Sequence, residues 1–221
     1  MECIADRFKD NVDFYKERVE TGTTIMAVCF KGGVVLGADS RTSAGGYYVV
    51  NRVTDKITEV DEKILCCRSG SAADTQFLAD VTKYHLKLLK AQTQKPNLVR
   101  SAANIFRKYC YGYRTELSAG MIVAGYDHVQ GQQVYGIPSG GSMYEAPFII
   151  GGSGSIFLYS YFDENYREGM DEESCIAFVQ NAVRMAVTRD SSSGGVARLA
   201  VVTADGIRRL PPMEIVYKPM I

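Results

Sequence analysis

The segment Thr23–Ala38 reads TTIMAVCFKGGVVLGA, and it decides which fold is predicted. Its first part, Thr23–Phe30, is rich in β-branched and apolar residues, which favours a buried strand. Lys31–Gly33 is typical of a tight turn, and Val34–Ala38 then returns as a second strand. The segment therefore predicts an antiparallel hairpin, whose open end brings Asp39 back beside Thr23.

The remaining elements come in blocks of one type. Further strands are expected at Lys63–Arg68, Gly120–Gly125, Gln133–Ile137, Tyr144–Ile150, Val196–Thr203 and Ile207–Leu210. Helices are expected at Asp74–Leu89, at Leu98–Tyr113, in a short piece that ends near Phe162, and from Asp171 to about Asp190. The buried faces are predicted to carry Phe77, Val81, Tyr84 and Leu88 in the first helix, and Ile176, Val179, Val183 and Ala186 in the last.

This order does not alternate strand with helix, so it does not favour a parallel βαβ protein. Antiparallel sheets with helices packed outside them explain the order better. We therefore predict an α+β fold, a four-layer α-β-β-α sandwich of two antiparallel sheets. Pattern alone leaves other α+β arrangements open.

Charge and cysteine content argue against several classes of function. Lys plus Arg and Asp plus Glu both number 25, and this zero net charge argues against nucleic-acid and membrane-surface binding. No apolar run approaches the roughly 20 residues that a membrane-spanning helix needs. The 6 cysteines form no C-x-x-C pair and the chain has 2 histidines, so neither a zinc site nor another metal site is expected. The thiols are expected to be buried and free, with Cys66 and Cys67 facing opposite sides of a strand.

Common catalytic motifs are missing from the sequence. There is no G-x-S-x-G elbow and no P-loop. Gly152–Ser155 resembles a glycine-rich phosphate loop without its third glycine, and a flexible turn between a strand and a helix is the alternative interpretation.

Thr23 offers another kind of chemistry. Residues 1–22 form a charged, polar leader unlike a secretory signal, and it ends at Gly22. If the chain is cut after Gly22, Thr23 gains an α-amino group, with a reference pKa of about 7.7 to 8, that can deprotonate its own hydroxyl. Glycine would tolerate the sharp bend that self-cleavage requires. The alternative is that Gly22 and Thr23 simply begin an ordinary strand.

Two charged residues strengthen the first interpretation. Asp39 lies at the end of the returning strand, and Lys56 would complete a buried ion pair beside Thr23. Such a lysine would orient the hydroxyl and stabilise a developing alkoxide. Spacing alone leaves open that Asp39, Arg41, Asp55 and Lys56 are solvated surface charges.

Several motifs in order carry a family resemblance: Thr23–Val28, Gly37–Thr42, Asn51–Lys56, Cys66–Gln76 and Asp190–Gly195. Together they resemble the catalytic β subunits of the eukaryotic proteasome core, which are N-terminal-threonine (Ntn) hydrolases. The likeness covers Thr23 to Leu210. The run Cys66–Gln76 is most similar to that of the acid-preferring, caspase-like subunit.

The resemblance implies roles for individual residues. The catalytic group would be Thr23, Asp39, Lys56, Ser153, Asp190 and Ser193. The backbone N–H of Gly70 would form the oxyanion hole, and Ser43 would pair through its main chain with a substrate bound as an added strand. Other pocket-lining positions would be Thr42, Ala44, Thr54, Thr58, Ala72 and Gln76.

Specificity would rest on Arg68, whose planar donor fork suits the carboxylate of a Glu or Asp before the cleaved bond. Without the motif context, a surface arginine on an edge strand would be the usual interpretation of Arg68, and the motif context reverses it. An immune-type relative carries an apolar residue there, so Arg68 favours the constitutive kind. The chain departs from the family pattern in two places: Ser43–Val50 is about one residue longer, and Ser191 replaces a common glycine.

The resemblance also predicts the wider biology. Residues 1–22 would be a propeptide removed by autocleavage, and residues 23–221 one catalytic domain that needs no cofactor. Its partners would be other β subunits and α-ring subunits in stacked heptameric rings, and its substrates unfolded polypeptides in ubiquitin-dependent degradation, in the cytoplasm and nucleus. The alternatives are a non-catalytic, ring-forming β subunit, and another self-processing amidohydrolase that acts on a small amide.

Overall fold

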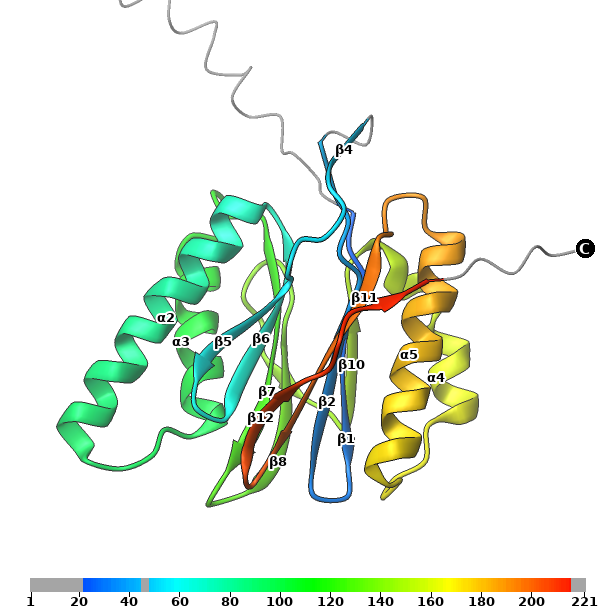
Figure 1. Ribbon diagram of the computed structural model, residues 1–221. Coiled ribbons are helices and arrows are strands. Elements are labelled where there is room, and N and C mark those ends of the chain that lie inside the picture. The colour runs from blue at the N-terminus through cyan, green and yellow to red at the C-terminus, as the bar shows by residue number, and fades with distance from the viewer. Residues whose placement is uncertain (1–21, 45–47, 216–221) are drawn as a thin grey trace, which may run out of the picture.

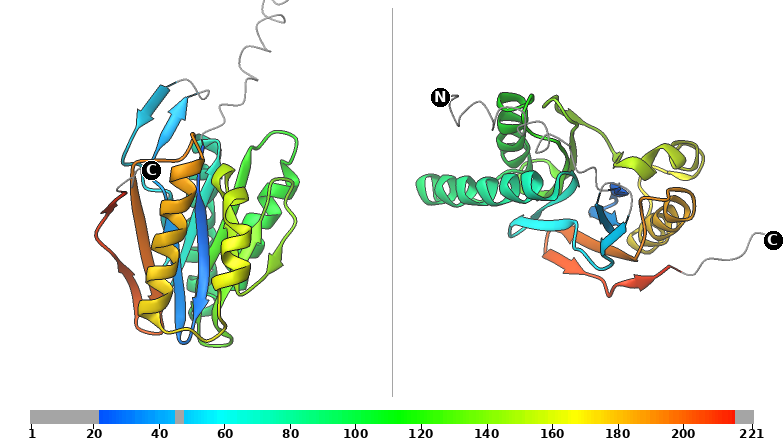
Figure 2. Two further views of the ribbon diagram at one scale, coloured as in Figure 1. Left: turned by 90° about the vertical axis from the view of Figure 1, so that its right-hand side faces the viewer. Right: turned by 90° about the horizontal axis from the view of Figure 1, so that it is seen from above.

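The computed structural model describes residues 22–44 and 48–215, and they form four stacked layers (Figures 1 and 2). Helices α2 (Ala72–Thr93) and α3 (Val99–Gly112) cover one side, and α4 (Tyr159–Asn165) and α5 (Glu172–Arg189) cover the other. Two antiparallel sheets lie between them. The predicted α-β-β-α sandwich is confirmed. None of the helices in these ranges is long and apolar enough to cross a membrane.

The first sheet contains the predicted hairpin and packs against α5. Its order is β10 (Phe148–Gly151), β1 (Ile25–Phe30), β2 (Gly33–Ala38), β11 (Val196–Thr203) and β12 (Gly206–Arg209), and β13 (Met213–Glu214) pairs with β11. Ile25 lies opposite Ala38 in the hairpin. This register brings Thr24 and Asp39 together at the open end, as the sequence predicts.

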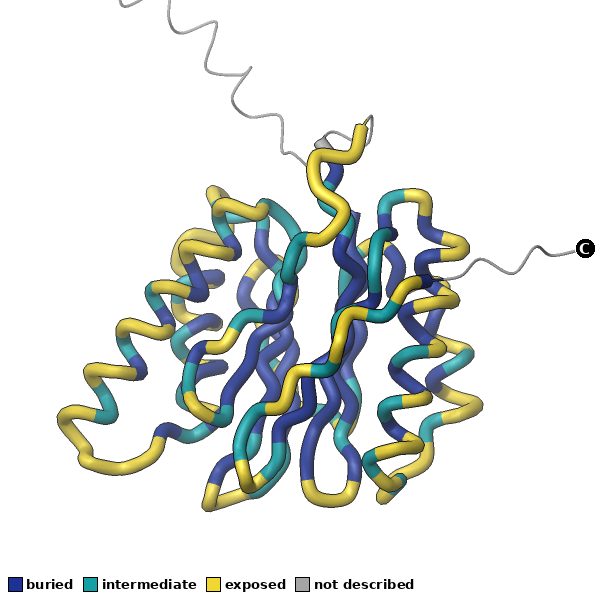
Figure 3. Tube along the Cα trace, viewed as in Figure 1, coloured by how far each residue is buried: buried dark blue, intermediate teal, exposed yellow. Residues whose placement is uncertain are grey.

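The second sheet packs against α2 and α3. Its order is β5 (Ile57–Asp61), β6 (Ile64–Gly70), β7 (Ala119–Asp127), β8 (Gly131–Ile137) and β9 (Tyr144–Glu145). A separate exposed hairpin, β3 (Thr42–Ala44) and β4 (Tyr48–Asn51), projects beyond the sandwich where β1 begins (Figures 1 and 3).

The buried apolar residues divide into three clusters, one for each interface between layers. One cluster, with Val179 and Val183, lies under α5; a second, with Leu78 and Phe106, lies under α2 and α3; the third fills the space between the sheets. Cys66 belongs to the second cluster and Cys67 to the third, so their predicted opposite orientation is confirmed.

The face that α2 buries differs from the prediction. Phe77, Tyr84 and Leu88 are 57%, 60% and 43% exposed, and Val81 is half-buried. The buried face instead carries Thr75, Leu78, Ala79, Thr82 and Leu86. Apolar side chains occur on both sides of this helix, and the smaller ones fit closely against the sheet, so periodicity identified the wrong stripe. In α5, by contrast, Val179, Val183 and Ala186 are buried as predicted, with Ile176 half-buried.

The predicted strand Tyr144–Ile150 is wrong, because the chain changes sheets within it. Tyr144–Glu145 pairs with β8, whereas Phe148–Gly151 pairs with β1 in the other sheet. Pro147 lies between the two strands and has no N–H for a ladder. The short helix expected to end near Phe162 consists of a 3₁₀ helix, η2 (Ser153–Phe157), and α4.

Candidate active site

Thr23 lies two residues before the start of β1, where the ends of both sheets meet. Both Gly22 and Thr23 are buried, and Thr23 is 2% exposed. The Thr23 backbone N–H donates to Ser153 Oγ over 3.1 Å. Thr23 is therefore fixed at the end of the inter-sheet core rather than displayed on the surface.

Asp39 follows β2 and is fully buried. Its Oδ1 accepts hydrogen bonds from the Thr24 N–H (2.9 Å) and Lys56 Nζ (2.7 Å). Its Oδ2 accepts from the backbone N–H groups of Arg41 (3.1 Å) and Gly194 (3.0 Å). These four donors offset the cost of burying a carboxylate and fix its orientation toward the lysine.

Lys56 connects the Asp39 carboxylate to the Gly22–Thr23 bond. Its Nζ lies 2.7 Å from Asp39 Oδ1, 3.1 Å from Thr23 Oγ1 and 3.0 Å from the Gly22 carbonyl oxygen. An ammonium has three N–H groups, and these three contacts use all of them. Burial lowers the pKa of Lys56 from its usual value, and the Asp39 carboxylate opposes that change.

The Ser153 hydroxyl links the Thr23 nitrogen to a second carboxylate, that of Asp190. Asp190 Oδ2 accepts hydrogen bonds from Ser153 Oγ (2.8 Å) and Ser193 Oγ (2.6 Å). Ser193 Oγ also lies 2.8 Å from Thr24 Oγ1. The three residues come from η2 and from the turn after α5, and the fold brings them together around Thr23 as predicted.

Gly22 has a packing requirement that the sequence did not reveal. A Cβ at this position would lie 1.8 Å from Ser192 Cβ and 2.5 Å from the Ser192 carbonyl oxygen. Any larger residue would therefore displace the turn that carries Ser193. Close approach gives a reason for glycine that is separate from the predicted sharp bend.

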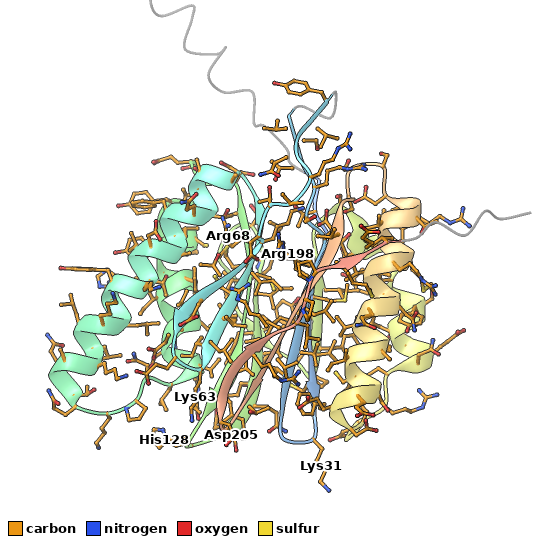
Figure 4. All side chains as sticks on the ribbon, in the orientation of Figure 1. Lys31, Lys63, Arg68, His128, Arg198 and Asp205 are labelled. Carbon is orange, nitrogen blue, oxygen red and sulfur yellow. The ribbon has the colours of Figure 1, made fainter. Side chains whose placement is uncertain are left out.

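Arg68 lies near the end of β6, on the side that faces β5 and α2 (Figure 4). Its Nε donates to Thr58 Oγ1 (2.9 Å), its Nη2 to the Asp55 carbonyl oxygen (2.9 Å), and its Nη1 to Thr75 Oγ1 (3.4 Å). These bonds use three of the five N–H groups and hold the guanidinium plane in place. Arg68 is half-buried rather than a mobile surface arginine.

The sequence is similar to those of known proteins along most of its length. The sequence model described as proteasome subunit matches residues 19–202. The chain belongs to the proteasome subunit family. It is 52% identical to proteasome subunit beta type-1 of Saccharomyces cerevisiae over 195 residues, 88% of this chain and 90% of the relative.

Two further relatives support a β-type subunit. Proteasome subunit beta type-6 of Dictyostelium discoideum is 49% identical over 191 residues, 86% of this chain and 89% of the relative. Proteasome subunit beta type-9 of Homo sapiens is 52% identical over 189 residues, 86% of this chain and 85% of the relative. The three similarities cover 86% to 88% of this β-type subunit.

The remaining predicted pocket residues of the subunit surround Arg68 and β3. Thr42 Oγ1 donates to Thr54 Oγ1 over 2.8 Å, and Thr58 holds Arg68. Ala72 and Gln76 are exposed at the start of α2. Ser43 is buried in β3, and its Oγ has no hydrogen-bond partner among residues 22–44 and 48–215. The backbone of Ala44 lies in β3, and its side chain is outside the described part of the subunit.

Gly70 ends β6 with a φ of +105°, a conformation that favours glycine. A Cβ there would lie 2.3 Å from the Ser118 carbonyl oxygen. The backbone of Gly70, the predicted oxyanion donor, is therefore held by its pairing with β7 and by close contact with Ser118.

The surface-charge alternative holds for one of the four charged residues. Asp55 pairs with Arg209 over 2.7 Å, with both side chains about two-fifths exposed at 43% and 40%. Arg41 is half-buried and donates to the Ser191 carbonyl oxygen over 3.1 Å. For Asp39 and Lys56 the alternative is wrong, because both are buried and paired with each other.

Sequence reasoning missed two hydroxyls that contact the predicted site residues. Thr24 bonds Ser193, and Thr75 bonds Arg68. Neither has a sequence signal beyond its position beside a predicted site residue. In the described part of the subunit, no group of three or more His, Cys, Asp or Glu side chains is placed to hold a metal ion.

Proposed function

We propose that this β-type subunit is a threonine endopeptidase of the proteasome core, with Thr23 as its nucleophile. The observation that carries the proposal is the position of Lys56 Nζ, within hydrogen-bonding distance of Asp39 Oδ1, Thr23 Oγ1 and the Gly22 carbonyl oxygen. A buried ammonium in that position favours negative charge on the threonine oxygen and on the carbonyl at the same time.

The first reaction removes the propeptide, residues 1–22. Thr23 Oγ attacks the carbonyl carbon of Gly22, the Gly22–Thr23 C–N bond breaks, and the acyl group passes to Oγ as an ester. Water then hydrolyses the ester, leaving a carboxylate on Gly22 and an amine on Thr23. The hydroxyl proton passes to the Thr23 nitrogen as the C–N bond breaks, and the Lys56 ammonium stabilises the negative charge that develops on Oγ and on the Gly22 carbonyl oxygen.

The second reaction cleaves substrates. The new amine on Thr23 takes the proton from its own hydroxyl and later returns it to the leaving amine. Ser153, Asp190 and Ser193 hold that nitrogen, since the Thr23 nitrogen already contacts Ser153 Oγ at 3.1 Å. The Gly70 N–H stabilises the oxyanion, a contribution of about 3 kcal/mol for a single donor.

Substrates are polypeptides that bind in extended form beside β3, at Ser43, with an acidic side chain directed toward Arg68. The fixed guanidinium plane supports this preference, because three bonds already orient it. The subunit acts within rings of other β subunits and α-ring subunits, on unfolded proteins of the ubiquitin pathway, in the cytoplasm and nucleus. A non-catalytic ring subunit would need neither Thr23 nor the buried Asp39–Lys56 pair.

The acid preference is tested with Arg68→Ala in assembled particles. Turnover of peptides with Glu before the cleaved bond should fall about tenfold or more relative to peptides with Leu, the loss expected for a charged hydrogen bond. Arg114→Ala is the matched control, because Arg114 is exposed and stacks on Tyr111. Equal losses for the Glu and Leu peptides would remove Arg68 from the substrate pocket.

A further inference from the structure

A cavity of about 290 Å³ lies beside Thr23, and of its lining residues only Gly70 has a role proposed above. It is formed by the ends of β1, β6, β7, β8 and β10, so it lies between the two sheets. Its floor is apolar and buried, and consists of Ile25, Met121, Ile122, Ile137, Ile149 and Ile150.

The cavity begins next to the reacting atoms. Gly70, the proposed oxyanion donor, lines one wall, and Gly152 lines another. Gly152 has a φ of +82°, and a Cβ there would lie 2.0 Å from the Thr23 carbonyl oxygen. A carbonyl group attacked by Thr23 would therefore lie at the entrance of the cavity.

The cavity and Arg68 lie on opposite sides of β6. The strand order is β5-β6-β7-β8, and the Arg68 guanidinium reaches toward Thr58 on β5. The cavity is instead lined by Gly120 and Met121 on β7 and by Gly136 and Ile137 on β8. A polypeptide that places one residue at Arg68 must continue past Thr23 toward this other side.

We infer that this cavity receives the side chain of the residue that follows the cleaved bond, and that it selects uncharged, mainly apolar side chains. The inference rests on the proposed peptidase function. Of the described residues that line the cavity, none is charged. An unpaired charge buried there would cost several kcal/mol of solvation, whereas an apolar side chain gains from leaving water.

The size and walls of the cavity fit one side chain of a bound polypeptide. Its volume is at the lower end of the range for ligand pockets. Glycines at 70, 120, 136, 151 and 152 leave room for a substrate backbone to approach the walls. The rim is polar but neutral, and Ser139 and Tyr144 are exposed there.

The test uses assembled particles and peptides that are identical up to a Glu, followed by Leu, Ser, Lys or Asp. Only cuts after Glu that disappear in Thr23→Ala particles are counted. We expect kcat/KM for Leu and Ser to exceed that for Lys and Asp about tenfold or more. Equal values for all four peptides would overturn the inference.

A Glu substrate with an aromatic amine dye as leaving group separates the two proposals. If Thr23-dependent dye release is absent, the peptidase function itself is wrong. If dye release occurs while the four peptides are cleaved equally, only the role of the cavity is wrong.

A rim variant gives a second, independent readout. Ser139→Glu places a carboxylate at the mouth, and we expect the Lys-to-Leu cleavage ratio to rise roughly fivefold, as for a partly exposed ion pair. Ser142→Glu is the matched control, because Ser142 is exposed in the same loop and does not line the cavity. An unchanged ratio, or equal changes in both variants, would overturn the inference.

Discussion

Two buried carboxylates lie at opposite ends of the strands, and each accepts four hydrogen bonds. Asp39 follows β2 beside Thr23, and one of its four donors is the Lys56 ammonium. Asp127 ends β7, and its donors are three backbone N–H groups, from Val99, Val129 and Gln130, and the Gln133 side-chain amide. Both groups are satisfied, but only Asp39 is paired with a cation.

The two carboxylates have different partners: Asp127 holds only structural groups, whereas Asp39 holds the lysine of the proposed active site. Asp127 holds the first residue of α3, which has no side-chain cap of its own, and so places a negative charge at a helix N-terminus. Asp39 instead positions a lysine whose other two N–H groups contact a hydroxyl and a carbonyl. Burial alone therefore does not distinguish the two carboxylates, whereas the buried lysine that contacts the proposed nucleophile does.

Neutralising each carboxylate in turn tests whether Asp39 acts on activity and Asp127 on stability. Asp39→Asn should lower both processing and peptide hydrolysis by about a hundredfold, because Lys56 loses its ionic partner. Asp127→Asn should leave hydrolysis unchanged and destabilise the subunit by about 1–3 kcal/mol. Hydrolysis by assembled particles and amide-exchange protection of β7 and β8 measure the two effects. Similar activity losses in both variants would remove the distinction.

Gly22→Ala tests a feature that Asp127 lacks, since only the Asp39 cluster contacts the bond that the proposed self-cleavage would break. The added Cβ would meet the Ser192 backbone, so the Gly22 carbonyl should move from Lys56 and propeptide removal should slow about tenfold or more. Gly112→Ala is the control, because a Cβ there meets nothing within 4 Å. The remaining precursor is measured on a denaturing gel over time. Normal processing of Gly22→Ala would contradict the packing argument.

The smallest expected effect is a pH dependence of stability at Asp127. Burial raises the pKa of this carboxyl, but its hydrogen bonds outweigh that and lower it overall. Its stabilising contribution is therefore present above the unfolded-state pKa and disappears as the pH falls through the folded-state pKa. The difference in unfolding free energy between wild type and Asp127→Asn should therefore shrink as the pH falls through the folded-state pKa. A difference that grows toward acid would contradict this sign.

Local sequence patterns predicted the layers and the position of Asp39. Blocks of β-branched segments and amphipathic segments favoured antiparallel sheets with helices outside them, although the pattern left other α+β arrangements open. The hairpin at Gly32 determines that Asp39 returns to Thr23. Lys56 was put forward as the partner of Asp39 from the residues, but spacing left open that both are surface charges, because the burial of Lys56 depends on an approach across 33 residues of chain. The β3–β4 hairpin was missed because both strands are short and β4 is exposed along its whole length.

The errors have a common physical origin. The buried stripe of α2 and the division of Tyr144–Ile150 between two sheets are settled by tertiary packing, which periodicity does not report. The contact between Gly22 and Ser192 joins residues from opposite ends of the chain. The hydrogen bond between Thr24 and Ser193 also joins residues far apart in the sequence. Contacts between small residues that are distant in the sequence were therefore the least predictable part of the site.

The central claim is that Thr23 becomes the first residue of a processed chain. It is tested most directly by determining the N-terminal sequence of this subunit in assembled particles, for wild type and Thr23→Ala. We expect the wild-type chain to begin at Thr23, and we expect Thr23→Ala to retain its leader and to lose hydrolysis after Glu. A wild-type chain that still carries residues 1–22 in particles that cleave after Glu would contradict it.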